Sequence, residues 1–117
     1  MKEPAYLYGA KLKRIIDGDT VDLMVDLGFR TLTYQRFRLK GINTPSIFGV
    51  SKDSSEYKQG QKAREYVMQR FKENDGECLV KSHRMEKYGR WIGEIWFRDS
   101  EKSLNQELFD HDLAEVM

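Results

Sequence analysis

The sequence of 117 residues predicts one α+β domain, a five-stranded β-barrel with helices packed on its outside. The first observation is the alternation of apolar and polar residues early in the chain, which is typical of antiparallel strands with one buried face. The second is a long amphipathic segment at residues 56–73, the best candidate for a helix. The third is the element order: three strands, a helix, two strands and a second helix. This order is typical of OB-type barrels, which bind nucleic acids or sugars on one face.

The predicted strands early in the chain are separated by short turn signals. Residues 5–16 form the first strand, and Asp17-Gly18-Asp19 turns the chain into the second strand at residues 20–27. The apolar residues that share one face of the second strand are Val21, Leu23 and Val25. After a reversal at Gly28, residues 29–39 form the third strand, and its expected apolar members are Phe29, Leu32 or Tyr34, Phe37 and Leu39.

One long helix and a shorter one complete the expected fold. A loop at residues 43–55 leads into the helix at 56–73, which Ser54 or Ser55 can cap and which Asn74-Asp75-Gly76 ends. Its core-facing stripe is expected to contain Tyr57, Ala63, Tyr66, Val67, Arg70 and Phe71. The remaining expected elements are strands at 77–83 and 90–98, a short helix at 103–110 and a short strand at 113–117.

The composition is that of a soluble globular protein, with 39% apolar and 33% charged residues. The net charge is only +1, from 20 basic and 19 acidic residues, so a phosphate-binding surface has to come from local clustering of cations. The only cysteine, Cys78, excludes an internal disulfide, and its place in a strand predicts a core residue. His83 and His111 have no metal-ligand spacing.

The sequence predicts no membrane contact. No segment approaches the ~20 apolar residues of a membrane span, and the first eight residues lack the apolar centre of a signal peptide. We therefore expect a cytoplasmic protein, and a secreted protein whose leader has been removed is the alternative.

Two carboxylates flank a glycine in the segment Ile16-Asp17-Gly18-Asp19-Thr20-Val21. Hard cations prefer several oxygen ligands on rigid backbone, and carboxylates at a strand end provide them. The same residues are also common in ordinary turns. Taken alone, this segment leaves a cation site and a plain turn as alternatives.

Two further segments combine features that suit phosphate binding. Arg36 and Arg38 share one face of the third strand, where an arginine facing a cleft can bind a phosphate with two hydrogen bonds. Lys87, Tyr88 and Arg90 crowd a short loop, and such a group suits a nucleotide, with cations for the phosphate and an aromatic ring for the base. Solvated surface side chains are the alternative in both segments.

The three segments "IDGDTV", "RFRLKGINTP" and "EKYGR", in this order and with similar gaps, resemble the staphylococcal nuclease-like (thermonuclease) domain family. The resemblance extends from about residue 11 to residue 114. It implies an OB-fold barrel of five strands with packed helices, in one domain over residues 1–117. It also implies a calcium-dependent phosphodiesterase that acts on DNA, RNA or both with little sequence preference.

The resemblance assigns the metal ligands by position. Asp19 matches the first calcium-ligand aspartate of the family, and Asn43 stands where a second ligand aspartate is usual. Thr44 matches the residue that offers its backbone carbonyl to the ion. Calcium accepts amide oxygens, but its affinity falls as ligand charge is lost.

The resemblance also assigns the phosphate-binding and water-activating positions. Arg38 and Arg90 match the two arginines that contact the scissile phosphate, and Lys87 and Tyr88 match residues that flank the bound nucleotide. Ser46 stands where a glutamate normally activates or orients the attacking water. A hydroxyl is a poor base at neutral pH, and a general base typically contributes ~10²–10⁴-fold to the rate.

Three nearby acids can replace the missing glutamate: Asp17 beside Asp19, Asp53 in the following loop and Glu56 at the helix start. Acids at a helix start are also favoured by the helix dipole alone. Two functions stay open at this point. One is a nuclease that is weakened or inactivated by Asn43 and Ser46, and the other is an inactive nuclease-like module that binds nucleic acid or protein.

Overall fold

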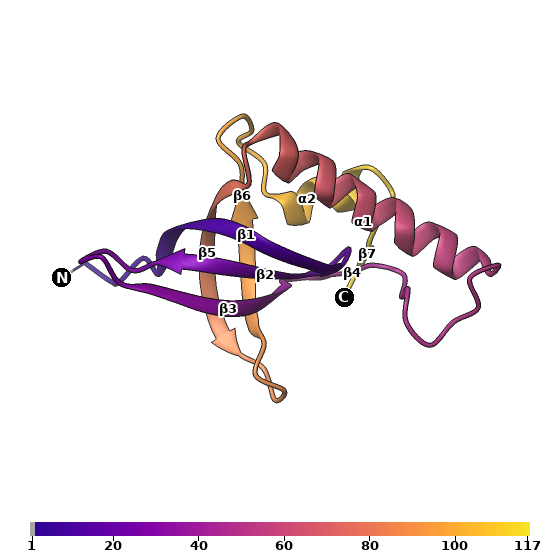
Figure 1. Cartoon of the computed structure of the whole chain (residues 1–117), viewed down its shortest axis with the longest axis horizontal. Coiled ribbons are helices and arrows are strands. Elements are labelled where there is room, and N and C mark those ends of the chain that lie inside the picture. The colour runs from indigo at the N-terminus through magenta and orange to yellow at the C-terminus, as the bar shows by residue number, and fades with distance from the viewer. Residues whose placement is uncertain (1) are drawn as a thin grey trace.

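A closed β-barrel with two helices beside it makes up residues 2–117, which the computed structural model describes (Figure 1). Its strands are β1 (Leu7–Asp17), β2 (Thr20–Asp26), β3 (Leu32–Leu39), β4 (Ile42–Asn43), β5 (Glu77–Met85), β6 (Trp91–Trp96) and β7 (Glu115–Val116). Its helices are α1 (Ser55–Glu73) and α2 (Leu104–Asp110). The predicted α+β barrel is confirmed, and so is the order of its main elements.

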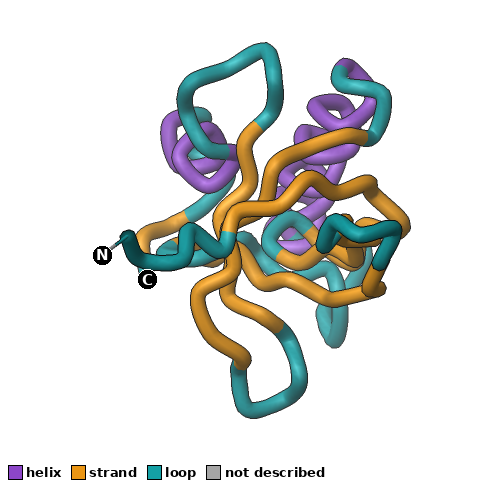
Figure 2. Tube along the Cα trace, turned by 90° about the vertical axis from the view of Figure 1, so that its left-hand side faces the viewer, coloured by secondary structure: helices purple, strands orange, loops and turns teal. Residues whose placement is uncertain are grey.

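The barrel strands follow one another around the ring in the order β1-β2-β3-β6-β5, and β5 closes it by pairing with β1. The β3–β6 pair is parallel, whereas the other four pairs are antiparallel. The short strands β4 and β7 form a separate ribbon at one end of the barrel. Figure 2 shows the two helices, in purple, in the upper half of the view, one to the left and one to the right of the strands.

Alternation along β2 buries the residues that the sequence predicts. Val21, Leu23 and Val25 point into the barrel and are almost completely buried. Cys78 also lies in the core, where burial raises the pKa of its thiol to about 12. The core prediction for these residues is therefore confirmed.

The expectation that Phe29 is an apolar strand member is wrong. Phe29 has a φ of +55° and is fully exposed, with a relative exposure of 102%. It lies in the β2–β3 turn, where the Thr31 N–H donates to the Gly28 carbonyl at 2.9 Å. Phe37 and Leu39 are buried in the barrel core, so alternation along β3 places Leu32 and Tyr34 on the opposite, outer face, where both are exposed.

Helix α1 begins and ends as expected. The Tyr57 N–H donates to the hydroxyl of the N-cap Ser54 at 3.1 Å, and Asn74 is the C-cap. The apolar stripe that α1 buries against the barrel consists of Gly60, Ala63, Val67 and Phe71. Within residues 2–117, no helix is both long enough and apolar enough to cross a bilayer.

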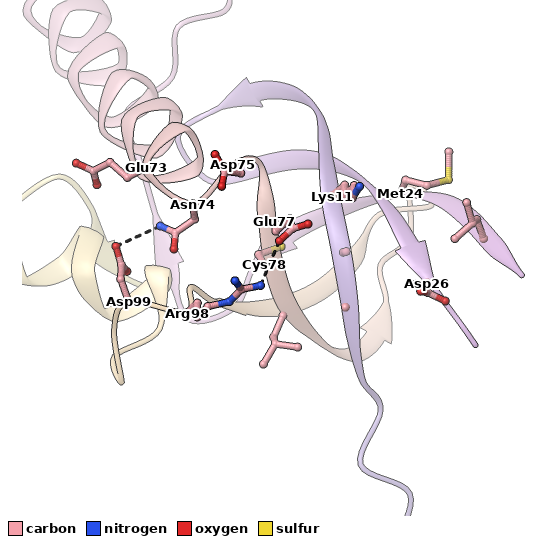
Figure 3. Close-up of a pocket in the computed structure, with 14 residues that line it drawn as sticks. Lys11, Met24, Asp26, Glu73, Asn74, Asp75, Glu77, Cys78, Arg98 and Asp99 are labelled. Atoms are coloured by element: carbon pink, nitrogen blue, oxygen red, sulfur yellow. Dashed lines mark hydrogen bonds and ion pairs between the residues drawn. The ribbon is translucent and has the colours of Figure 1, made fainter. Parts of the chain in front are cut away.

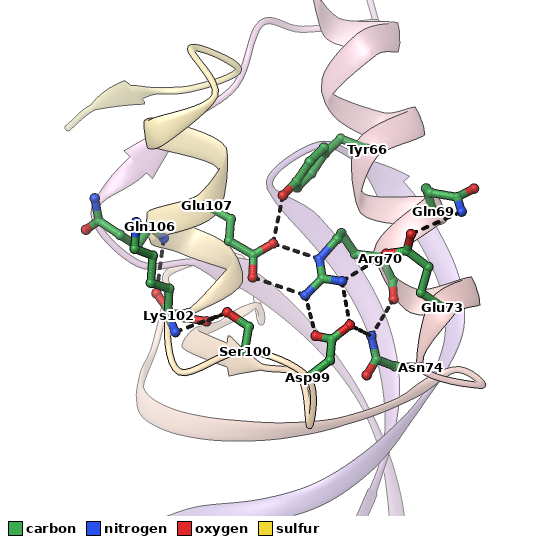
Figure 4. Close-up of polar contacts among 11 residues, drawn as sticks. Tyr66, Gln69, Arg70, Glu73, Asn74, Asp99, Ser100, Lys102, Gln106 and Glu107 are labelled. Atoms are coloured by element: carbon green, nitrogen blue, oxygen red, sulfur yellow. Dashed lines mark hydrogen bonds and ion pairs between the residues drawn. The ribbon is translucent and has the colours of Figure 1, made fainter.

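Arg70 joins α1 to α2 through a dense polar network (Figure 4). Its guanidinium donates to Glu107 on α2 at 2.8 Å, to Asp99 at 2.6 Å and to Glu73 at 2.9 Å. The Tyr66 hydroxyl also donates to Glu107 at 2.8 Å. The hydrogen bonds from Arg70 lower the pKa of Asp99 to about 2. Glu107 is the buried acceptor on which both helices converge.

We predict that Glu107→Ala lowers the free energy of unfolding by about 2–4 kcal/mol, because it leaves donors of Arg70 and Tyr66 without their buried acceptor. Chemical denaturation at pH 7 measures this loss. Glu101→Ala is the matched control, since Glu101 is exposed and its removal is expected to change stability by less than about 0.5 kcal/mol. Equal effects of the two substitutions would contradict the prediction.

Candidate functional site

The turn between β1 and β2 packs closely against α1 and the loop after β4. A Cβ at Gly18 would lie 2.7 Å from the Ala63 Cβ and 3.0 Å from the Thr44 Oγ1, so only glycine permits this approach. The Asp19 N–H donates to the Asp17 carboxylate at 3.1 Å, which fixes the turn. The turn therefore places both carboxylates beside the segment that carries Asn43 and Thr44.

Asp19 is a buried carboxylate held by three separate segments. Its Oδ2 accepts from the Thr44 N–H at 3.1 Å, and its Oδ1 accepts from the Thr20 hydroxyl at 3.0 Å. The Arg38 guanidinium lies 3.6 Å from Oδ2. The structure thus brings the first and third predicted metal ligands into direct contact.

Arg38 lies between Asp19 and Asn43. Its Nη2 donates to the Asn43 Oδ1 at 3.0 Å, and its Nη1 donates to the backbone carbonyls of Ile42 at 3.1 Å and Leu39 at 3.3 Å. One of the two predicted phosphate-binding arginines therefore contacts two of the predicted metal ligands. We refer to Asp17, Asp19, Arg38, Asn43 and Thr44 as the acid cluster.

The two carboxylates of the acid cluster titrate very differently. Burial raises the pKa of Asp17 to about 7, and the adjacent Asp19 contributes to this rise. Burial acts against the charge of Asp19 too, but hydrogen bonds from Asp17 and from the Thr44 N–H outweigh it and lower the Asp19 pKa. The shared proton of the pair therefore resides on Asp17.

The acid cluster fits an oxygen-preferring divalent cation, but with few charges. The Thr44 Oγ1 is buried and has no hydrogen-bond partner within residues 2–117, so an unused oxygen lies beside the carboxylates. Carboxylate, amide and hydroxyl oxygens are the donors that calcium accepts. Across the described residues, no group of three or more His, Cys, Asp or Glu side chains is placed to hold a metal. The fit thus depends on neutral oxygens in addition to two carboxylates.

Ser46 and two of the proposed replacement acids lie outside the acid cluster. The Ser46 hydroxyl donates to the Phe48 carbonyl at 2.8 Å and accepts from the Phe48 N–H at 3.1 Å, so its oxygen is engaged within its own loop. Asp53 and Glu56 are exposed, and in residues 2–117 neither carboxylate forms an ion pair with Arg38. Of the three acids, the structure brings only Asp17 to the site.

Arg90, Lys87 and Tyr88 lie on the β5–β6 hairpin. The Gly89 N–H donates to the Glu86 carbonyl at 3.1 Å, and Gly89 has a φ of +81° that favours glycine in this turn. Arg90 lies 3.3 Å from the Glu86 carboxylate, while the Lys87 ammonium lies 5.7 Å from the centre of the exposed Tyr88 ring. The predicted nucleotide-contacting residues are therefore together, and they are accessible to a ligand.

Two cavities with cationic linings lie on the β3 and β6 side of the barrel. One, of about 320 Å³, is lined by Arg38, Lys40 and Arg84 together with four uncharged or histidine residues. The other, of about 620 Å³, contains Arg36 and Arg90. Because the net charge is near zero, a phosphate-binding surface needs a local cluster of cations. Such a cluster is present on this side of the barrel.

The largest cavity, of about 780 Å³, lies elsewhere (Figure 3). Acidic residues outnumber basic ones in its lining, and they are Asp26, Glu73, Asp75, Glu77 and Asp99. Its basic lining residues are Lys11 and Arg98. It contains none of the predicted site residues, and its charge disfavours a phosphate ligand.

Comparison with known families decides the membership of this chain. A family model described as "Staphylococcal nuclease homologue" matches residues 36–117. The chain belongs to the staphylococcal nuclease homologue family. The match includes Arg38, Asn43, Ser46 and Arg90 but begins after the turn that carries Asp19. No curated protein sequence matches the chain.

The buried carboxylate of Asp22 in this nuclease homologue was not predicted from the sequence. Asp22 has a relative exposure of only 2%, and its carboxylate accepts from Arg36 at 2.7 and 3.1 Å and from the Tyr34 hydroxyl at 2.7 Å. Asp22 lies between the inward-facing Val21 and Leu23 of β2, so alternation places it on the outer face, where Arg36 and Tyr34 cover it. The signal for its burial is the turn at residues 28–31, because that turn sets Asp22 directly opposite Arg36 in the β2–β3 pair.

We predict that Asp22→Asn lowers the free energy of unfolding by about 1 kcal/mol at pH 7, because the ion pair with Arg36 is lost. Hydrogen bonds from Arg36 and from Tyr34 lower the pKa of Asp22, and the charge of Arg14 acts in the same direction. The carboxylate therefore contributes stability above its unfolded pKa of 3.8, and this contribution disappears as the pH falls through the lower folded pKa.

Denaturation series of both proteins between pH 7 and pH 2.5 measure this effect. The two stabilities are expected to approach each other as the pH falls below the unfolded pKa of 3.8 and to meet only below the folded pKa. Asp26→Asn is the matched control. Asp26 lies on the same face of β2 but is exposed, and an asparagine can still accept the 2.8 Å hydrogen bond from the Gly28 N–H. A loss at Asp22→Asn that stays constant over the whole pH range would show that the ion pair is not its cause.

Proposed function

We propose that this nuclease homologue is a calcium-dependent phosphodiesterase that hydrolyses DNA or RNA with little sequence preference and at a reduced rate. The observation that carries the proposal is the contact of Arg38 with both Asp19 and Asn43. A phosphate-binding cation and oxygen ligands for a metal thereby lie within one cluster. Phosphodiester hydrolysis requires such a pairing, since negative charge on the phosphoryl oxygens has to be offset where water attacks.

The residues that would hold the ion are Asp19, Asn43 and Thr44. Bound calcium supplies Lewis acidity and a template for the substrate. The proton on Asp17 competes with the ion for the carboxylate pair, so we expect the affinity for calcium to rise as the pH increases through 7.

Two arginines and the hairpin residues would bind the substrate. Arg38 and Arg90 are the cations that stabilise growing negative charge on the phosphoryl oxygens. The exposed Tyr88 ring and the adjacent Lys87 ammonium suit contacts with a base and with the backbone. Nucleic acid is accordingly the ligand that this surface fits.

The reduced rate follows from Ser46, which stands where the family pattern has a water-activating glutamate. The Ser46 oxygen already donates to and accepts from Phe48, and a hydroxyl is a poor base at neutral pH. We assign the remaining ability to orient water to Asp17, because it alone of the three replacement acids is hydrogen-bonded to Asp19.

A nuclease-like module that binds nucleic acid without cleaving it is the second candidate. This candidate is favoured because the two residues that differ from the family pattern already form hydrogen bonds within the chain. The Asn43 amide oxygen accepts from Arg38, and the Ser46 hydroxyl donates to the Phe48 carbonyl. Such a module would retain the cationic surface and lose hydrolysis. Cleavage assays separate the two candidates.

We predict slow cleavage of single-stranded DNA or RNA that requires added calcium and stops with a chelator. The double variant Asn43→Asp, Ser46→Glu is expected to cleave ~10²-fold faster or more, because it restores a metal-ligand charge and a general base. Gel analysis of end-labelled strands measures both rates. Asp19→Asn in the double variant is the control, and it should abolish the gain.

The outcomes have distinct meanings. Cleavage by the double variant alone would favour the binding module for the natural chain. If neither protein cleaves or binds nucleic acid while both are folded by circular dichroism, the proposed function is wrong.

We further predict that Asp17→Asn lowers the residual cleavage rate at least about tenfold, because the only contacting acid is lost. Asparagine at position 17 keeps an oxygen that can accept the Asp19 N–H, so the turn is expected to persist. Asp53→Asn and Glu56→Gln remove acids of the same kind outside the cluster and should leave the rate within about twofold. A greater loss at Asp53 or Glu56 than at Asp17 would refute the assignment.

A further inference from the structure

The cavity of about 620 Å³ beside Arg90 contains a set of residues that the proposed cleavage chemistry does not use. Asp22 and Arg36 form one wall of it together with Tyr34, and Tyr88 and Arg90 come from the β5–β6 hairpin. The cavity therefore joins two arginines and two tyrosines on the outer surface of the barrel.

Arg36 is held in one orientation by a buried carboxylate. Its Nε lies 2.7 Å from Asp22 Oδ1 and its Nη2 lies 3.1 Å from Asp22 Oδ2, so one edge of the guanidinium is fully engaged. Within residues 2–117, the remaining nitrogen, Nη1, has no hydrogen-bond partner. The Arg36 side chain is 44% exposed. A rigid guanidinium thus presents free donors to solvent, and phosphate oxygens are matching acceptors.

The same carboxylate holds Tyr34. The tyrosine hydroxyl donates to Asp22 Oδ2 at 2.7 Å, and the residue remains 51% exposed. A ring that is fixed at its hydroxyl and open over much of its surface is preorganised for stacking, since little side-chain entropy is lost when a base binds. Tyr88, which is 77% exposed, is the second aromatic side chain of the cavity.

Arg90 lies next to Arg36 because β3 and β6 are parallel. Phe37 pairs with Trp91, so the same register extended by one residue sets Arg36 opposite Arg90. The Arg90 Nε is buried and has no partner among the described residues. Two guanidinium groups from neighbouring strands therefore line one cavity, and adjacent phosphates of a single strand need such spaced cations.

We propose that Arg36 and Tyr34 form a subsite for the nucleotide adjacent to the phosphate bound by Arg90, with Asp22 as the residue that positions both. Arg36 binds the backbone phosphate of that nucleotide, and its base stacks on Tyr34. Stacking requires an unpaired base, so the preferred substrate is single-stranded nucleic acid. The inference rests on the proposed function only in that nucleic acid is the ligand, since it concerns binding and not hydrolysis.

Binding of a fluorescein-labelled single-stranded octanucleotide, measured by anisotropy with a chelator present to prevent cleavage, tests the phosphate contact. Arg36→Gln removes the cation but keeps a donor for Asp22, and we expect about tenfold weaker binding. The slope of log Kd against log salt should fall by about 0.7, the value for one lost phosphate contact with a single strand.

Arg98→Gln is the matched control. It removes one cation whose side chain is 86% exposed, and it lies in the lining of the acidic cavity and not in the proposed subsite. Its Kd should stay within about twofold of the parent, with an unchanged salt slope. If Arg36→Gln acted only by weakening the fold, the slope of log Kd against log salt would stay unchanged. A lower slope therefore indicates a lost phosphate contact.

Two substitutions of Tyr34 test the stacking contact. Tyr34→Leu removes the ring and should weaken binding at least about fivefold, whereas Tyr34→Phe keeps the ring and should stay within about twofold. If the parent binds the octanucleotide but Arg36→Gln behaves like Arg98→Gln, the subsite is overturned and the proposed function stands. If the folded parent binds no single strand at all, the proposed function fails together with the subsite.

Discussion

The buried carboxylate of Asp19 is the constraint on which the rest of the site depends. A charge removed from water needs several donors, and no single segment of this chain supplies them. Thr20 on β2 and the backbone of Thr44 after β4 donate hydrogen bonds, and Arg38 on β3 adds an ion pair at 3.6 Å. Because all three converge on one group, the relative positions of these segments are fixed together. Gly18 permits this convergence, since a side chain there would collide with Ala63 and Thr44.

The charge balance of the acid cluster follows from this constraint. Asp19 carries a negative charge, and the positive charge of Arg38 offsets it. Asp17, whose pKa is raised to about 7, stays protonated below that pH and adds no charge. Asn43 adds no charge and instead accepts from Arg38. The charges of the cluster are thus balanced by groups of the chain itself. An aspartate at position 43 would compete for Arg38 and shift this balance toward metal binding.

Much of the fold was predictable because its signals are local. Alternation identifies the buried face of β2, and the serine and asparagine caps define α1. Phe29 was misplaced because alternation cannot show where a turn ends. The contacts of Asp19 with Arg38 and Thr44 were not predictable, since both depend on segments brought together only by the complete fold. Motif resemblance named the positions of the acid cluster, whereas their hydrogen-bond partners required coordinates.

The two residues that depart from the family pattern lie apart from the residues proposed to bind nucleic acid. Asn43 belongs to the acid cluster, and Ser46 lies in the loop that follows β4. Arg36 and Arg90 lie on the outer face of β3 and on the β5–β6 hairpin, and their carboxylate partners are Asp22 and Glu86. None of these contacts involves position 43 or 46. In the proposed function, the acids missing at those positions would weaken hydrolysis and would leave the cationic and aromatic surface complete.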